Sequence, residues 1–558
     1  MASSGEPRVR TAADVRTYLS NAVTTFRNTL AKLLPGERPS WLVLELSGSY
    51  PARKVKRKFL ARALGMSERP SSQEEFEAQV SSLLRADWLT GVVLRVGDLS
   101  ADLASAYAVR NQLLRLRAGG KRVVVVATNL GNTSYFLASA ADRLIAPESA
   151  EFFVNGMSLG ATFMADALER FGVRFDKLAI KEYKNAGDQF VLPAMSEAQR
   201  EQYDALLHSF QTSTGEAIAA SRSTSAEAVK GWVDEGVTSA AQAQRRGMID
   251  QVAYEDQVMS KQHRPYAAGA RFIPGVRRPA GGRHVAVVSL VGNIVPGKSR
   301  KLPIPLPLFG DALAGSDTLV RALRAAAKNE RTAALVFHVD SGGGSALASD
   351  LIWREVKLLA EKMPVVAVMG QLAASGGYYV LTHATEVIAA PTTITGSIGV
   401  VMAKAVLEEF NDKHGFNPES VKRGRYAEIM SSARGFDEQE RELLARYMGE
   451  IYQRFVARVA DGRGLSEERV NEIGRGRIWS GADAVQLGLV DRLGDVSAAI
   501  ARAKELAGLR PDAPSWNVPA PHSYLPPNAA EPSTLLRTVG KLFNERALLM
   551  HGIPVNIR

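Results

Sequence analysis

A serine in a segment of small residues is the first candidate for chemistry. Ser375 lies in the segment 371–379, which follows an apolar run and is expected to begin a helix extending towards Val387. Peptide dipoles at a helix N-terminus favour negative charge on or near a serine oxygen there. A serine at this position is also an ordinary helix N-cap. Ser375 is therefore a candidate nucleophile that still needs a base.

A run of glycines is the second candidate. Gly342, Gly343 and Gly344 follow Asp340 and Ser341, between an expected strand and an expected helix. Glycines let a substrate backbone approach closely, and amides at a helix start can bind an anion. A tight strand-to-helix turn is the alternative. The run is not a P-loop, because no Gly-Lys-Ser/Thr follows it.

The base could be a histidine or a lysine. Of eight histidines, only His338 and His383 lie near these motifs in sequence. His338 is expected inside a strand, and His383 lies about 12 Å along the helix expected after Ser375. A Ser–His–Asp triad built from distant histidines stays open. Lys184, at an expected strand-to-loop junction, can act as a base only if burial lowers its pKa from about 10.4. The alternative for Lys184 is a solvated surface cation.

An internal repeat supports the lysine. Five pairs of segments match at an almost constant offset of about 244 residues: 42–48 with 285–292, 91–96 with 334–339, 122–127 with 364–369, 134–147 with 378–391, and 247–250 with 488–491. The first copy has Gly131 where the second has Ser375, and the second has Ala427 where the first has Lys184. Such complementary losses are typical of one active site divided between two halves.

Each copy alternates short apolar runs with helical patterns, which predicts βαβ units and an α/β fold with mostly parallel sheets flanked by helices. The expected organisation is an N-terminal amphipathic helical segment at 1–40, repeats at 41–262 and 284–510, a linker at 263–283, and a Pro-rich tail with a short helix at 511–558. Residues 11–34 could lie on an anionic membrane surface or, more simply, dock on their own or a neighbouring subunit.

Composition excludes several classes of function. The chain has 558 residues, of which 46% are hydrophobic and 23% charged, so it is globular. It has no cysteine, which excludes disulfides, thiolate nucleophiles and cysteine-ligated metals. The net charge of +11 is too dispersed to indicate a nucleic-acid partner. No cofactor or metal site is indicated. No membrane span or signal peptide is evident, so a cytoplasmic or peripherally membrane-associated protein is expected.

Four motifs together resemble the signal peptide peptidase A (protease IV) family in its long, duplicated form. They are Tyr183–Ala186, Ala373–Tyr379, Thr395–Val400, and Trp479–Ala484 with Gly488–Asp491. The similarity runs from about Trp41 to Leu509. It implies tandem ClpP/crotonase-like domains, a Ser–Lys dyad serine peptidase, a homotetramer, and hydrophobic peptide substrates such as released signal peptides.

The resemblance also implies a role for each site residue. Ser375 would be the nucleophile and Lys184 the general base, with the amides of Gly344 and Gly376 holding the oxyanion and Ser397 orienting the lysine. The family usually has Ser-Pro-Gly-Gly where this chain has Ser341–Gly344, and its bacterial form usually begins with a membrane anchor. Three alternatives stay open: a soluble cytoplasmic peptidase of other peptides, a crotonase-like acyl-CoA enzyme, and a non-catalytic scaffold.

Overall fold

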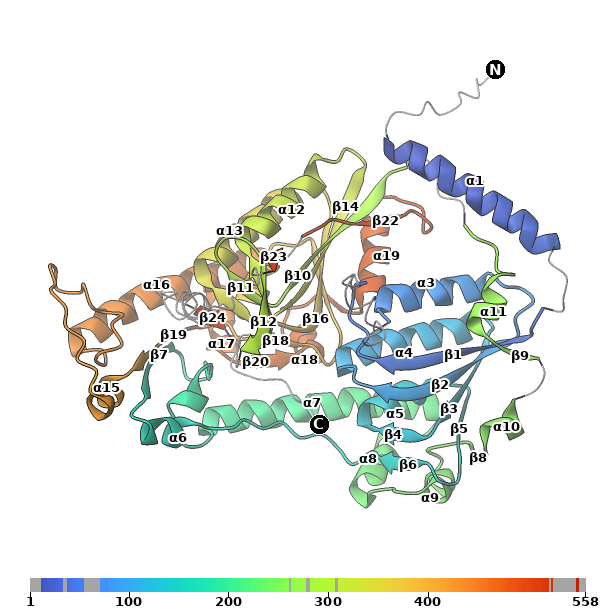
Figure 1. Cartoon of the computed structure of the whole chain (residues 1–558), viewed down its shortest axis with the longest axis horizontal. Helices are drawn as coiled ribbons and strands as arrows, with labels where there is room; N and C mark the ends of the chain where they lie inside the picture. The colour runs from blue at the N-terminus through green and yellow to red at the C-terminus, as the bar shows by residue number, and fades with distance from the viewer. Residues whose placement is uncertain are drawn as a thin grey trace.

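The computed structural model describes residues 12–33, 38–54, 71–259, 262–276, 282–306, 310–520, 523–524 and 548–550. Two α/β units lie side by side, one built from the first half of the chain and one from the second (Figure 1). Each unit has a central, mostly parallel sheet with helices on its faces. The predicted fold class is therefore confirmed.

The first sheet is entirely parallel, because each of its strands is followed by a helical crossover. In spatial order it contains β8 (Gln251–Val252), β5 (Arg143–Ala146), β3 (Arg122–Ala127), β2 (Gly91–Leu99), β1 (Trp41–Gly48) and β9 (His263–Pro265). The helices that connect these strands are α3 (Gln73–Leu84), α4 (Leu103–Ala118) and α5 (Asn132–Ala138). Beside this sheet, β4 (Asn129–Gly131) pairs with β6 (Glu151–Phe153).

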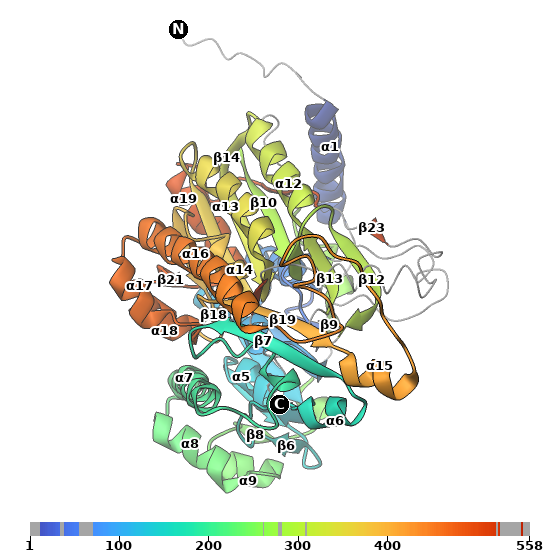
Figure 2. The same cartoon turned by 90° about the vertical axis from the view of Figure 1, so that its left-hand side faces the viewer.

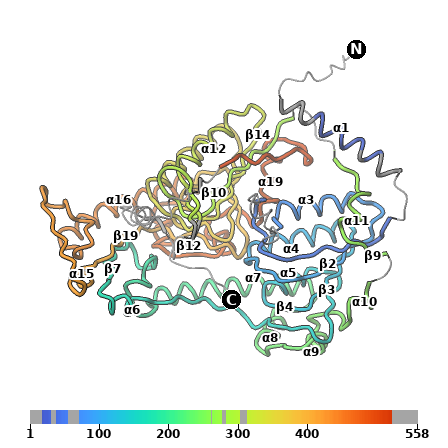
Figure 3. Tube along the Cα trace, viewed as in Figure 1, coloured from blue at the N-terminus to red at the C-terminus, as the bar shows by residue number. Residues whose placement is uncertain are grey.

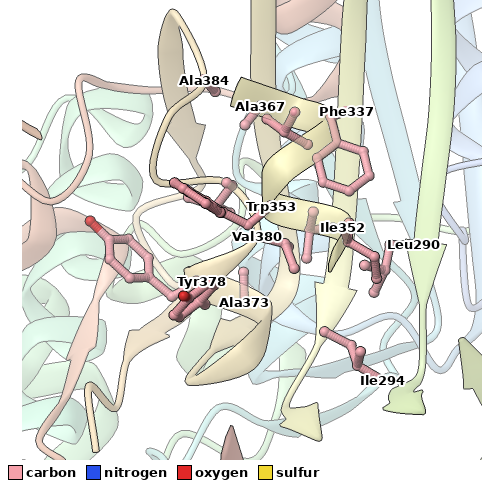
Figure 4. Packing of buried hydrophobic residues seen from close by; sticks show 14 of the residues in the cluster. Leu290, Ile294, Phe337, Ile352, Trp353, Ala367, Ala373, Tyr378, Val380 and Ala384 are labelled. Carbon is pink, nitrogen blue, oxygen red and sulfur yellow. The ribbon is translucent and has the colours of Figure 1, made fainter. Parts of the chain in front are cut away.

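The second sheet repeats this arrangement. Its main path is β20 (Ile478–Ser480), β18 (Ile394–Gly396), β16 (Val365–Ala374), β14 (Thr332–Ser341), β10 (His284–Val291) and β22 (Ser515–Asn517). Off this path, β17 (Glu386–Ala389) pairs with β16, and β21 (Arg492–Leu493) pairs with β17. Its helices are α12 (Ser316–Lys328), α13 (Ala346–Ala360), α14 (Gly376–Tyr379) and α19 (Val496–Leu506). Figure 4 shows the core between sheet and helices, where Leu290, Phe337 and Ile352 have no exposed surface.

Both sheets end in equivalent edge strands. β9 pairs with β1 as β22 pairs with β10. β9 and the following α11 (Tyr266–Ala270) fall in the stretch expected to be a linker. β22 falls in the expected Pro-rich tail, as do β23 (Ser523–Tyr524) and β24 (Leu548–Met550). The short helix expected near the C-terminus lies largely outside the described residues.

A third sheet joins the two halves of the chain. Its order is β23, β12 (Arg300–Leu306), β13 (Gly310–Gly315), β11 (Asn293–Val295), β15 (Gly343–Ser345), β24, β19 (Val400–Val406) and β7 (Arg174–Ile180). Along its full length β7, from the first half, pairs antiparallel with β19, from the second (Figure 2). A strand of the first repeat is thus part of a sheet of the second.

Long helices strengthen this connection. α7 (Glu197–Arg222) runs beneath both units, as the Cα trace shows (Figure 3). The Ser209 hydroxyl of α7 lies 2.7 Å from that of Ser480 in β20. α16 (Glu438–Arg463) is equally long and packs in the second unit. The other helices of the described residues are α6 (Ala165–Arg170), α8 (Ala226–Glu235), α9 (Ala240–Arg245), α10 (Glu255–Val258), α15 (Glu408–His414), α17 (Glu467–Ile473), α18 (Gly481–Gln486) and the 3-10 helix η1 (Asp188–Phe190).

The N-terminal helix predicted from apolar spacing is α1 (Ala12–Leu33). It is tied to the protein at Asn28, whose amide donates to the Gly275 carbonyl at 3.0 Å and accepts from the Gly275 N–H at 2.8 Å. Leu19, Val23 and Phe26 are each more than 60% exposed. Within the described ranges, no helix combines the length and apolar character that crossing a bilayer requires.

Candidate active site

Three side chains from distant segments meet at one buried point. Lys184 Nζ lies 2.6 Å from Ser375 Oγ, 2.9 Å from the Ser397 carbonyl oxygen and 3.0 Å from Ser397 Oγ. All three residues are at most 1% exposed. The first half of the chain supplies the lysine and the second half supplies both serines. The structure therefore brings together the three predicted site residues that act through their side chains.

The pairing of β7 with β19 places the lysine. At the end of that ladder Ile180 lies opposite Val400, three residues after Ser397. The chain then turns sharply at Lys181, whose φ of 74° lies in the left-handed region. The Tyr183 N–H donates to the Arg475 carbonyl at 3.2 Å, which holds the loop against the second unit. The register of one antiparallel pair thus fixes where the Lys184 side chain begins.

Two glycines make room for this lysine. A Cβ on Gly476 would lie 2.5 Å from the Lys184 nitrogen and 2.8 Å from its Cα, and a Cβ on Gly399 would lie 3.1 Å from Lys184 Cδ. Gly476 also has a φ of 83°, which side chains with a Cβ rarely adopt. Sequence reasoning missed Gly476. The sequence signal that could have identified Gly476 is the pair of glycines, Gly474 and Gly476, just before the motif that begins at Trp479.

Burial changes the ionisation of Lys184. Loss of water lowers the pKa of the Lys184 amine well below its usual value, and the nearby Lys177 cation lowers it further. Lys177 itself is paired with Asp188. Among the described residues, no carboxylate forms an ion pair with Lys184. The amine therefore has the environment that favours its neutral form.

A neutral amine matches the atoms around it. It has two N–H donors and one lone pair. The Ser397 carbonyl oxygen can only accept a hydrogen bond, and Ser397 Oγ can accept a second. When both donors are used in this way, the lone pair remains for the Ser375 hydroxyl, which can donate its proton. The Ser397 N–H donates to the Arg477 carbonyl at 2.7 Å, so this turn is itself held in place.

Ser375 has the backbone of a sharp strand-to-helix turn. Its φ and ψ are 54° and −117°, between β16 and α14, and its N–H donates to the Gly396 carbonyl at 2.8 Å. Its side chain makes no capping hydrogen bond, so the N-cap alternative does not apply. The expectation of a helix reaching towards Val387 is wrong: α14 ends at Tyr379, because the chain turns there into the short segment that leads to β17.

Gly343 and Gly344 belong to a short strand, β15, rather than to the tight turn that was the alternative for this run. β15 places Gly344 at a φ of 149°, opposite Ile294 of β11. A Cβ on Gly376 would lie 3.2 Å from the Gly344 nitrogen and 3.1 Å from Gly343 Cα. The Gly376 amide is the first of α14, where helix amides have no partner within the helix. Gly344 and Gly376 thus lie side by side next to Ser375.

Within the described residues, no histidine is hydrogen-bonded to Ser375. His383 is bonded elsewhere: its Nδ1 accepts from Trp353 Nε1 at 2.9 Å, and its Nε2 lies 2.9 Å from an Asp461 carboxylate oxygen. His338 is buried in β14, as its sequence position predicted. In the part of the chain that the structure describes, there is also no cluster of three metal-ligating side chains.

An extended segment of the same chain lies beside the glycines. β24 is antiparallel to β15, with Leu549 opposite Gly344 and Met550 opposite Gly343. On its other side Leu548 is paired with Val401 of β19. The space between β15 and β19 therefore accommodates a peptide backbone in a strand conformation.

Comparison with known proteins identifies the family. The family model of peptidase family S49 matches residues 115–267 and 357–510, one segment in each half, so the chain belongs to this family of peptidases and the predicted resemblance is confirmed. "Serine protease SPPA, chloroplastic" of Arabidopsis thaliana is 32% identical over 439 residues, which cover 75% of this chain and 64%, just under two thirds, of that protein. "Protease 4" of Salmonella typhi is 28% identical over 442 residues, 76% of this chain and 70% of that protein.

Among solved structures, a mutant of ClpP1 from Listeria monocytogenes has a TM-score of 0.24 and 15% identity, and the match covers 38% of this chain and 94% of that one. The family model occurs twice, which confirms the tandem duplication inferred from the repeated segments.

Proposed function

We propose that the protein is a serine endopeptidase in which Ser375 is the nucleophile and Lys184 the general base. The observation that carries this proposal is the 2.6 Å separation of Lys184 Nζ and Ser375 Oγ at a site closed to solvent. Nucleophile and base must lie within hydrogen-bonding distance, and a lysine base must be neutral. The distance supports the first condition, and the lowering of the Lys184 pKa by burial supports the second.

The reaction has two halves. Lys184 takes the Ser375 proton as Oγ attacks the scissile carbonyl carbon, and the carbonyl oxygen becomes an oxyanion. The intermediate then breaks the C–N bond, and the Lys184 ammonium gives its proton to the leaving amine. Water next attacks the acyl-serine while Lys184 accepts its proton, and collapse returns that proton to Ser375 Oγ.

The amides of Gly344 and Gly376 are proposed to stabilise the oxyanion. Their proximity supports this role, since a Gly376 Cβ would lie only 3.2 Å from the Gly344 nitrogen. Two backbone donors aimed at one point contribute to transition-state binding, and loss of one donor typically costs about 10²–10³ in rate. Gly342 stands where this family usually has a proline. The backbone before β15 therefore lacks the fixed φ that a proline ring would impose.

An extended, apolar peptide is the proposed substrate. The pairing of β24 with β15 supports it, because a substrate backbone in the same place would lie against Gly344. Adding a peptide strand to exposed sheet edges gives affinity through main-chain hydrogen bonds and specificity through side-chain pockets. Released signal peptides are the specific class that we propose, on the family resemblance.

Removing residues 548–558 is expected to raise kcat/KM for a hydrophobic peptide amide several-fold, chiefly through a lower KM. The reason is that β24 and the substrate would use the same edge of β15. Steady-state kinetics of the shortened and full-length chains check this. An unchanged or higher KM would place the substrate elsewhere.

The pH dependence follows from the lysine. Burial lowers the Lys184 pKa, so the amine is neutral at a pH where surface lysines are still charged. Below that pKa the protonated amine cannot accept the Ser375 proton, so kcat/KM should rise with pH and then level off. The inflection should lie well below about 10.4, the usual lysine value. An inflection near that value, or a rate that rises as pH falls, would contradict the mechanism.

Ser397→Ala is expected to lower kcat/KM about 10- to 100-fold, since it removes one of the two acceptors that orient the amine. Its carbonyl acceptor remains, so activity should not vanish. Ser139→Ala is a matched control, because Ser139 is equally buried and hydrogen-bonded but lies in the first unit. If the two variants have the same kcat/KM, Ser397 does not orient the Lys184 amine.

An acyl-CoA enzyme of related fold and a non-catalytic scaffold are the competing functions. A crotonase-like enzyme would use the glycine amides to polarise a thioester and would not need both Lys184 and Ser375. Activity on acyl-CoA that survives Ser375→Ala would support it. A lack of inhibition by serine-directed acylating reagents, with a flat pH profile, would support the scaffold.

We also propose a homotetramer and a peripheral membrane contact through residues 11–34. The exposed Leu19, Val23 and Phe26 of α1 support the membrane contact, since apolar side chains on a helix surface can enter a lipid interface. Flotation with anionic vesicles tests the contact, with Phe26→Glu as the variant expected to lose it. Light scattering of the purified chain tests the oligomer.

A further inference from the structure

A large cavity lies between the two units, away from Ser375. Its volume is about 910 Å³, and residues from both halves of the chain line it. The first half contributes Arg53, after β1, and Asp102, at the start of α4. The second half contributes His338 and Asp340, both on β14. Lys184, Ser375 and Gly344 are not among its lining residues.

Two buried groups in this cavity lack hydrogen-bond partners. His338 is 2% exposed, and neither of its ring nitrogens has a partner among the described residues. Arg53 Nη2 is also buried without a partner, although Arg53 Nε lies 3.7 Å from Glu74. Buried polar atoms are normally paired, because an unpaired one loses its hydration without replacement. These groups point to a ligand with polar atoms of its own.

Two of the carboxyl groups that line the cavity, those of Asp340 and Asp102, have no cationic partner among the described residues. Asp340 accepts from the Leu372 N–H at 3.2 Å, and Asp102 caps α4 by accepting from the Ser105 N–H at 2.8 Å. Burial and the Asp102 charge raise the pKa of Asp340 to about 7. Two acids with no cation bonded to either in the described residues favour a positively charged group on the ligand.

Charges of both signs face the cavity in equal number. The lining includes three cationic side chains, Arg53, Lys54 and Lys301, and three acidic ones, Asp102, Asp340 and Asp495. A ligand with a single sign of charge would be repelled by half of this set. A zwitterion satisfies both halves, and the volume is large enough for several amino-acid residues.

We propose that this cavity binds a short peptide with free ends, its carboxylate against Arg53 and His338 and its ammonium group against Asp340 and Asp102. This site is separate from the proposed catalytic centre and goes beyond the proposed function. A neutral His338 has one donor and one acceptor, so it can donate to the carboxylate. Arg53 supplies the matching charge.

The site is connected to the catalytic loops. Asp340 directly precedes Ser341 and the glycines that lead into β15. Its hydrogen bond to Leu372 holds β16, which ends at Ala374, the residue before Ser375. A Cβ on Gly370 would lie 2.7 Å from the Asp340 carboxyl carbon, so the two strands are in close contact there. A ligand that pulls on Asp340 therefore acts on the backbone behind both proposed oxyanion donors.

Calorimetric titration of the full-length Ser375→Ala chain with trialanine tests the proposal. We expect one trialanine per chain, with binding at least 10-fold weaker in Arg53→Met and in Asp340→Asn. N-acetyl-trialanine amide, which lacks both charges, should also bind at least 10-fold more weakly. Arg510→Met and Asp512→Asn, which remove an exposed ion pair of the same residue types, should bind as the parent does.

Three results of the titrations with the Ser375→Ala chains would overturn the proposal. They are no binding of trialanine at millimolar concentration, equal binding in the Arg53 and Asp340 variants, and equal binding of the blocked peptide. If either charge variant fails to fold, His338→Phe, which removes the ring nitrogens, replaces it. Wild-type chain blocked at Ser375 by a fluorophosphonate should still bind trialanine, and loss of binding there would assign the peptide to the active site instead. Because binding is measured, the outcome does not depend on whether the protein is a peptidase.

Discussion

Ser375→Ala is expected to lower kcat/KM for a hydrophobic peptide amide by about 10⁴-fold or more, because no acyl-enzyme can then form. The variant keeps the backbone and loses one oxygen, so folding should be unaffected. Rates are measured with the full-length chain at a pH above the activity inflection, and circular dichroism checks the fold. Residual activity within 10-fold of the wild type would exclude Ser375 as the nucleophile.

A control distinguishes the loss of chemistry from the loss of a buried hydroxyl. Ser139→Ala removes a buried, hydrogen-bonded serine at the end of α5, in the first unit. It should change the melting temperature at least as much as Ser375→Ala does and leave kcat/KM near the wild-type value. The difference between these two variants then reports on nucleophilic catalysis alone.

Lys184→Met is expected to lower kcat/KM by a similar factor while raising stability at neutral pH. Activity is lost because the base is removed. A nucleophile and its base act together, so removing either one lowers the rate by about as much as removing both. Stability changes in the opposite direction because burial lowers the Lys184 pKa in the folded state. The unfolded chain therefore binds a proton at Lys184 more readily than the folded chain does. At any pH below the unfolded pKa of this lysine, Lys184 lowers the free energy of unfolding, and this destabilisation becomes smaller as the pH rises towards that value.

The melting temperature of Lys184→Met at pH 7 checks the second effect. It should exceed that of the wild type, and the difference should shrink as pH increases. Lys184→Arg is the companion variant, because arginine keeps the charge but cannot become neutral at accessible pH. We expect it to be inactive and less stable. An active arginine variant would show that a neutral amine is not required.

Much of the fold could be predicted because its strands are buried on both faces. The runs 42–48, 91–96 and 122–127 correspond to β1, β2 and β3 within a few residues at either end. The repeat offset also identified Gly131 as the counterpart of Ser375, and the structure places these two residues directly before α5 and α14. These signals are local or repeated, so a single sequence contains them.

Contacts between halves could not be predicted in the same way. The complementary loss of Lys184 and Ser375 suggested a shared site, but hydrophobic patterning does not say that β7 leaves its own unit to pair with β19. Gly399 and Gly476 matter only because Lys184 passes between them. The length of α14 was overestimated, since small residues and tyrosines after Ser375 continue a helical pattern that tertiary packing interrupts.

The cavity between the units could not be predicted from the sequence either. His338 was correctly expected to lie inside a strand, where a buried histidine is usually bonded to a neighbour. The structure shows that neither ring nitrogen of His338 has a hydrogen-bond partner among the described residues, and that Arg53 and Asp102 of the first unit line the same cavity. The hydrophobic pattern of the sequence predicts which residues are buried. Which side chains they contact depends on how the two units pack against each other.

The central claim is that the Lys184 amine is uncharged at the pH where the enzyme works. The most direct test is an NMR titration of the lysine ε-carbons in the ¹³C-labelled Ser375→Ala chain, with the Lys184 signal assigned by its absence in Ser375→Ala/Lys184→Met. We predict that this signal titrates well below the other lysines, whose pKa values lie near about 10.4. A Lys184 signal that titrates together with the exposed lysines would contradict the account.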